Sequence, residues 1–139
     1  MDKKDHLALA EHFEEIANLI NDNDDNGKHI IGSIIAHHYS ALHYIDAYLY
    51  DVVKPPEERC PFSHKNDQEP NKSRYHIMLN NLDKDIFDRY ERLHNYSQRA
   101  RYKKGFKDFP PNHKQIDPFI KDDLKQIKKH VLNKLKLSK

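Results

Sequence analysis

The sequence predicts an all-α fold, arranged as an up-and-down bundle of four main helices with short extra helices. Apolar residues recur at three- and four-residue steps through several long segments, which is the period of a helix with one buried face. Regular alternation of apolar and polar residues, the pattern of a half-buried strand, does not occur, and the chain has only 3 glycines. With 139 residues, we expect a single domain over residues 1–139.

The segment from Ile30 to Val53 predicts a long, mostly buried helix at the centre of the bundle. Gly32, Ser33 and Ala36 lie early in this segment, and small side chains let neighbouring helices approach closely. Because its apolar stripe is broad, we expect the other segments to pack around it. The stripe consists of Ile31, Ile34, Ile35, His38, Ala41, Leu42, Ile45, Leu49 and Val52.

Other segments with helical periodicity cover residues 5–21, 73–81 and 83–103, and a last one starts at Asp117. Asp117-Pro118 is a capping residue followed by proline at the first helical position. The predicted core positions of the last two segments are Ile86, Phe87, Tyr90, Leu93, Ser97, Ala100, Ile120, Leu124, Ile127, Val131 and Leu135.

The loop over residues 54–72 contains four prolines and is long enough to carry function. Ser63 and His64 could edge a site there, and Ser63 acting as a helix cap explains them equally well. Cys60 is the single cysteine, so no internal disulfide forms, and we assign it no role. The N-terminus lacks the apolar core of a signal peptide, and no apolar run approaches the ~20 residues of a membrane span. We expect a cytoplasmic protein without membrane association.

The chain has 11 histidines, which raises the question of a metal site. Helical ligands share a face at steps of three or four residues, as His43 and Asp46 do, and likewise His12 and Glu15. Neither pair has an identifiable third ligand in the sequence. Residues 22–27 resemble the opening of a calcium loop, but the position that needs a closing glutamate is Ser33. We therefore expect no metal or other cofactor, with His38 in the core and His37 and His43 at the helix flanks.

Charge is distributed unevenly along the chain. Residues 1–70 carry 6 Lys/Arg against 14 Asp/Glu, a net of −8, and residues 71–139 carry 18 against 8, a net of +10. Two explanations stay open, a polyanionic partner for the second half or the docking of acidic helices on basic ones. Arginines interleaved with aromatic residues suit RNA, because guanidinium groups bind phosphates and rings stack on bases. The candidate RNA-binding residues are Arg92, Arg99, Arg101, Tyr102, Lys103 and Lys104.

Two motifs carry a resemblance to a known superfamily. The segment from Ala36 to Leu49, AHHYSALHYIDAYL, is followed by the proline-containing loop with Ser63-His64 and then by the segment from Tyr96 to Tyr102, YSQRARY. Their order and spacing resemble the HEPN (higher eukaryotes and prokaryotes nucleotide-binding) superfamily of small helical bundles over roughly residues 30–137. The resemblance implies a homodimer. It also implies either a metal-independent endoribonuclease or a module without catalysis that binds nucleotide, RNA or a protein partner.

The catalytic signature of that superfamily is an arginine followed after four to six residues by a histidine. Arg89-Tyr-Glu-Arg-Leu-His94-Asn-Tyr96 fits this pattern. By resemblance, Arg89 would hold a phosphate, His94 would act as general acid or base, and Tyr96 would orient the substrate or be modified by an antitoxin. Histidine can transfer a proton near neutral pH, and arginine stabilises developing phosphate charge. The resemblance thus implies a toxin or defence component, with a nucleotidyltransferase-type antitoxin as a partner.

Overall fold

The computed structural model describes residues 2–22, 30–53, 74–102 and 113–137. Within these ranges the chain forms helices and no strand, so the prediction of an all-α protein is confirmed. Four helices are long and one is short. They are α1 (Lys3–Asp22), α2 (Ile30–Val52), α3 (Arg74–Asn81), α4 (Lys84–Tyr102) and α5 (His113–Leu137).

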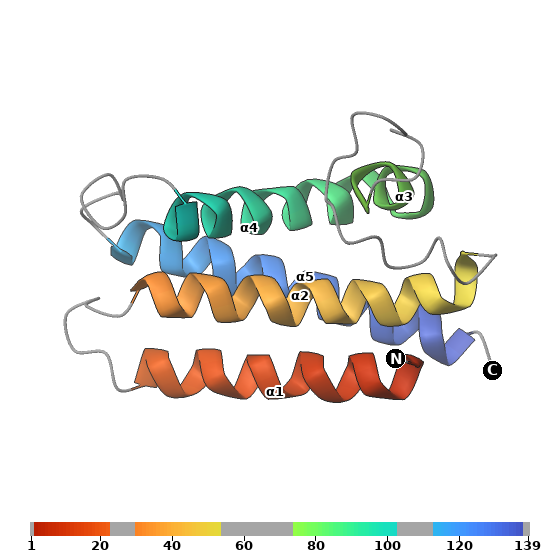
Figure 1. Ribbon diagram of the computed structural model, residues 1–139, viewed down its shortest axis with the longest axis horizontal. Helices are drawn as coiled ribbons and strands as arrows, with labels where there is room; N and C mark the ends of the chain where they lie inside the picture. The colour runs from red at the N-terminus through yellow and green to blue at the C-terminus, as the bar shows by residue number, and fades with distance from the viewer. Residues whose placement is uncertain (1, 23–29, 54–73, 103–112, 138–139) are drawn as a thin grey trace.

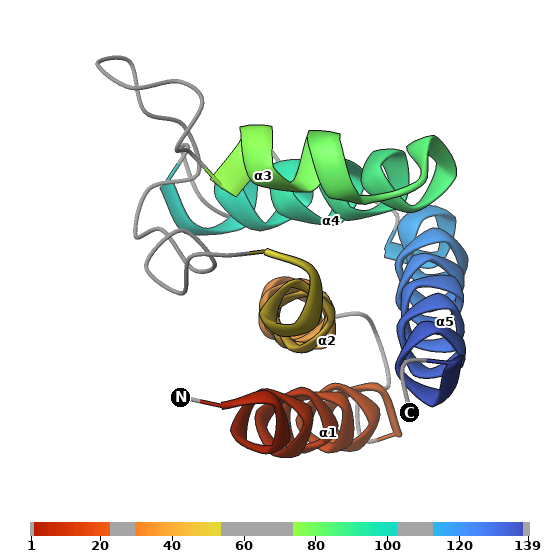
Figure 2. The ribbon, with the colours of Figure 1, turned by 90° about the vertical axis from the view of Figure 1, so that its right-hand side faces the viewer.

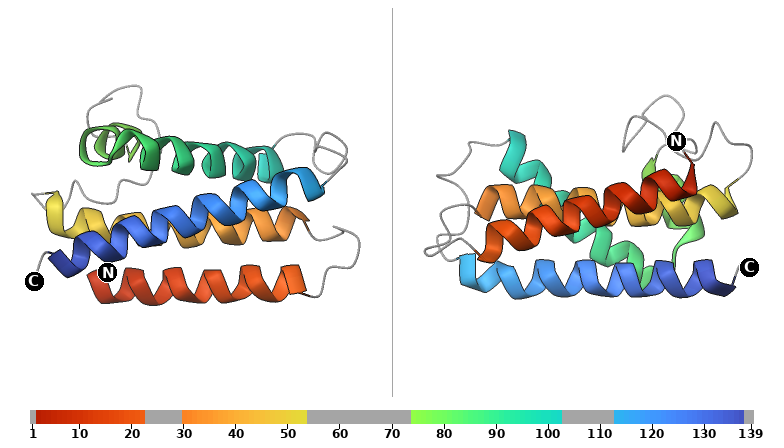
Figure 3. Two further views of the ribbon diagram at one scale, coloured as in Figure 1. Left: turned by 180° about the vertical axis from the view of Figure 1, so that it is seen from behind. Right: turned by 90° about the horizontal axis from the view of Figure 1, so that it is seen from below.

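Helix α2 lies at the centre of the molecule. Seen along α2, α1 lies on one side, α4 on the opposite side and α5 on a third side (Figure 2). The long helices follow one another in alternating directions, so α2 runs antiparallel to α1 and α4 and parallel to α5 (Figures 1 and 3). The short α3 precedes α4 and lies at its start (Figure 1). The predicted central position of residues 30–53 is therefore correct.

The core follows the predicted periodicity closely. Every predicted core position of α4 and α5 is buried, including Ser97 and the large side chain of Tyr90. On α2, Ile34, Ala41, Ile45 and Leu49 are fully buried. Three other positions of the predicted stripe, Ile31, Ile35 and Leu42, are only partly buried. At the end of the stripe, Val52 is 42% exposed and Val53 is buried instead.

Two local predictions were wrong. Helix α5 begins at His113, four residues before Asp117, so Pro118 lies within the helix. Pro118 is the sixth residue of this helix, past the four N–H groups that lack an intrahelical partner, so its missing N–H removes one backbone hydrogen bond and its ring crowds the carbonyl group four residues earlier. His37 was expected at the flank of α2, but it is buried, with Nδ1 2.8 Å from the carbonyl oxygen of Ser33.

Polar contacts also connect the helices. Lys128 on α5 donates to Glu14 on α1 (2.9 Å), and the hydroxyl of Tyr44 on α2 donates to the same carboxylate (2.9 Å). This acidic–basic contact supports docking between the two halves of the chain. None of the described helices combines the length and the apolar character needed to cross a bilayer. Cys60, Ser63 and His64 lie outside the described residues.

Candidate functional site

The predicted catalytic arginine contacts helix α5. The Arg89 guanidinium donates to Asp122 (2.9 Å) and Asp123 (3.1 Å) and to Asp85 within α4 (3.1 Å). Its side chain is 21% exposed, and the hydrogen bond from Arg89 lowers the pKa of Asp122. Three carboxylates therefore occupy the guanidinium that was expected to hold a phosphate.

The predicted catalytic histidine contacts helix α2 instead. His94 is buried, and its Nδ1 lies 3.4 Å from Nε2 of His38. The hydroxyl of Tyr90 lies 3.3 Å from the same Nε2 atom, and the rings of Tyr90 and His94 stack. Residues five apart on a helix point about 140° away from one another, which explains why Arg89 and His94 face different helices. Within one chain, the structure does not bring this pair together.

The predicted RNA-binding residues differ in their surroundings. Arg92 makes two hydrogen bonds to the buried carboxylate of Asp123 (2.7 and 2.9 Å), and Arg101 donates to the hydroxyl of Tyr39 (2.8 Å). Arg99 is exposed. The side chain of Tyr102 is not among the described ones, and Lys103 and Lys104 also lie outside the described residues.

A groove on the outer face of α4 brings several of the predicted residues together. Its volume is about 400 Å³. Tyr96, Arg92 and Arg99 all line it, so the groove contains one aromatic ring and two guanidinium groups. The remaining lining residues are Asp88, Glu91 and Asn95.

No family model, curated protein or solved structure matches this chain.

The outward face of α5 carries lysines that the sequence analysis did not single out. Lys121, Lys125 and Lys129 follow one another at four-residue steps, and Lys136 lies on the same face nearly two turns later. All four are exposed, and none forms an ion pair with a described residue. Their four-residue spacing was the signal in the sequence that could have identified this surface.

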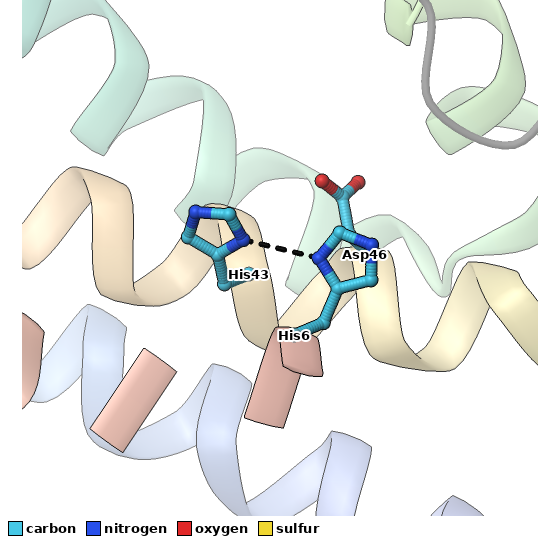
Figure 4. Close-up of side chains that lie close together, drawn as sticks. All are labelled: His6, His43 and Asp46. Carbon is cyan, nitrogen blue, oxygen red and sulfur yellow. Dashed lines mark hydrogen bonds between the residues drawn. The ribbon is translucent and has the colours of Figure 1, made fainter. Parts of the chain in front are cut away.

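The interior of the bundle holds a second cluster, formed by His6 on α1 and by His43 and Asp46 on α2 (Figure 4). Sequence analysis paired His43 with Asp46 but found no third ligand, because His6 is on another helix. The Nδ1 atoms of His6 and His43 are 3.1 Å apart. Asp46 is buried and forms an ion pair with Arg74 of α3.

Burial keeps the two imidazoles of this cluster neutral. Desolvation, followed by repulsion from His6 and Arg74, lowers the pKa of His43 to about 4. Desolvation also lowers the pKa of His6, although Asp46 opposes that shift. The ring of Phe13 lies parallel to His43, with the centroids 5.9 Å apart, and covers it from the α1 side. Neutral imidazoles next to a carboxylate can share protons or bind a cation.

Proposed function

We propose that the protein is a HEPN-like helical module that binds single-stranded RNA through the outer faces of α5 and α4. The observation that carries this proposal is the row of exposed lysines on α5. Each step of four residues advances about 6 Å along a helix, so Lys121, Lys125 and Lys129 present ammonium groups at regular intervals. Ammonium groups that contact phosphates release condensed counterions, which favours binding.

The groove on α4 supports the same proposal. Single-stranded RNA exposes base faces, and an aromatic ring next to guanidinium groups offers stacking together with phosphate contacts. Tyr96 and Arg99 supply these groups in the groove. Arg92 lies there too, with its guanidinium on Asp123, and we assign the main phosphate contacts to the α5 lysines.

Of the two functions that the HEPN resemblance implies, binding without catalysis fits these surroundings better. The carboxylates around Arg89 neutralise the charge that phosphate binding requires, and His94 is withdrawn from solvent. RNA cleavage by Arg89, His94 and Tyr96 is the alternative function, and the homodimer and a nucleotidyltransferase-type antitoxin stay predictions.

The test is fluorescence anisotropy with a labelled single-stranded RNA, titrated at several salt concentrations between 50 and 200 mM. About five phosphate contacts to a single strand would change the affinity by roughly 100-fold over this range. We expect wild-type binding to weaken steeply with salt. The double variant K121E/K125E should bind at least about ten-fold more weakly, with a salt slope smaller by roughly one for each lysine–phosphate pair that the substitutions remove.

A charge-matched control variant distinguishes binding at the proposed surface from binding that depends only on the net charge of the protein. K3E/K4E changes the net charge equally, and both of its lysines lie on α1, outside the proposed surface. The ion pair that Lys3 forms with Asp51 is partly exposed, so its loss should cost little stability. If this control loses affinity as much as K121E/K125E, the binding follows overall charge and the proposed surface is wrong. Absence of wild-type binding at 50 mM salt would overturn the proposal entirely.

A further inference from the structure

The cluster of His6, His43 and Asp46 has the composition of a transition-metal site. Each residue offers one ligand atom, and these atoms all lie within 4.8 Å of one another. The histidines come from two helices that pack side by side, so the cluster is fixed by the α1–α2 contact (Figure 4). Asp46 follows His43 by three residues, which places both on one face of α2.

The distance between the two imidazoles suits a shared ion. With metal–nitrogen distances of roughly 2.0–2.1 Å, two adjacent ligand nitrogens are roughly 2.9 Å apart at a right angle and roughly 3.4 Å apart in a tetrahedron. The Nδ1 atoms of His6 and His43, at 3.1 Å, lie between these values. A metal ion could therefore bind both imidazoles with little movement of the two rings. The ligand atoms of the whole cluster lie within 4.8 Å of one another, so the Asp46 oxygen would move closer to complete the site.

The ligand types also narrow the choice of ion. Two imidazoles and one carboxylate suit Zn²⁺, Co²⁺, Ni²⁺ and Fe²⁺, whereas Mg²⁺ and Ca²⁺ prefer oxygen ligands only. Three protein ligands leave at least one coordination position for water or another small ligand.

Arg74 opposes this binding and also provides a way to test it. Its guanidinium pairs with Oδ1 of Asp46, and its positive charge repels a cation. An ionised carboxylate has about four lone-pair sites on its two oxygens, so Asp46 can bind an ion while it keeps the arginine as a hydrogen-bond donor. Removal of the positive charge should therefore raise the metal affinity.

We propose that His6, His43 and Asp46 bind one divalent first-row transition-metal ion in the interior of the bundle. The protein, freed of any affinity tag and treated with EDTA, is titrated with Zn²⁺ by calorimetry and with Co²⁺ by visible absorption. We expect one ion per chain. His6→Ala and His43→Ala should each lower the affinity by about 100-fold or more, because each removes a direct ligand.

His12→Ala is the matched control, since His12 lies on the same helix as His6 but is exposed. It should bind as wild type does. Arg74→Gln should bind the metal ion more tightly than wild type does. An equal or lower affinity would contradict the assignment of Asp46 as a ligand. Equal binding by wild type, His6→Ala and His43→Ala, or no binding by wild type, would overturn the proposal.

A measurement on the wild type alone guards against variants that fail to fold. The Co²⁺ complex should show two strongly shifted imidazole N–H proton resonances, one from each coordinated histidine. One such resonance or none would contradict joint coordination by His6 and His43.

Discussion

The Nδ1 atom of His94 lies 3.4 Å from Nε2 of His38, at the contact between α4 and α2. The imidazole that a nuclease would need in an open groove is thus a buried contact between helices. His94 is buried against another imidazole and a phenol, so it contributes to the packing of α4 on α2 and is not accessible to a polymeric substrate.

This position leads to a prediction about RNA cleavage. In EDTA, a labelled structured RNA pool incubated with wild-type protein should stay intact, as it does with His94→Ala and Arg89→Ala. Gel electrophoresis of the RNA provides the measurement. Cleavage by the wild type that both variants lack would instead establish a metal-independent nuclease and its two residues.

The α4–α5 contact predicts unequal effects at two adjacent aspartates. Asp123 is buried and accepts hydrogen bonds from Arg89 and Arg92, so Asp123→Asn should lower the free energy of unfolding by roughly 3 kcal/mol. Asp122 is 53% exposed, and Asp122→Asn should cost much less, because solvent screens an exposed ion pair. Urea denaturation followed by circular dichroism measures both. Equal losses of unfolding free energy in the two variants would show that burial of the Asp123 carboxylate does not determine its contribution to stability.

The lowered pKa of His43 predicts instability in mild acid. Between pH 6.5 and about pH 4, the unfolded chain binds a proton at His43 that the folded chain does not, so the free energy of unfolding decreases as the pH falls through this range. His6 and Arg74 also face this imidazole and oppose its protonation, while Asp46 lies beside them. Urea midpoints of the metal-free protein in EDTA at pH 7, 6 and 5 test this. His43→Gln should flatten the dependence and His12→Gln should not, and the reverse pattern would contradict the assignment.

Gly32 predicts a stabilising substitution. A Cβ atom at this position would lie 3.4 Å from the terminal methyl group of Ile20, which is an ordinary contact. Alanine is a better helix former than glycine by roughly 1 kcal/mol, so Gly32→Ala should raise the free energy of unfolding by about 0.5–1 kcal/mol. Thermal denaturation provides the measurement. A lower melting temperature would mean that α1 and α2 are packed too closely for a methyl group.

The sequence predicted the helices well where burial repeats regularly. Helix α4 is an example, because Ile86, Tyr90, Leu93 and Ser97 all fall on the buried face that their spacing indicates. The start of α5 was predicted incorrectly because Asp117-Pro118, which is typical of a helix start, can also lie inside a helix that begins a few residues earlier.

The candidate site was harder to predict because its partners are distant in the sequence. His6 and His43 are 37 residues apart, and only the packing of α1 on α2 brings them together. The role of Arg89 depends likewise on which turn of α5 lies opposite it, since Asp122 and Asp123 are 33 and 34 residues away. Helical periodicity shows which face is buried but does not show the axial alignment of one helix with another.

The two histidines on opposite flanks of α2 have a consequence for how the fold is selected. His38 contacts α4 and His43 contacts α1, and the two residues point about 140° apart. A helix with only aliphatic side chains at these positions could rotate about its axis and still bury a similar apolar area. Rotation of α2 by one residue, about 100°, would separate both imidazoles from their partners, at a cost of roughly 1–3 kcal/mol for each buried group left unsatisfied. Together with the contacts of Tyr44 with Glu14 and of Asp46 with Arg74, the histidines therefore favour one rotational setting of α2 over the others.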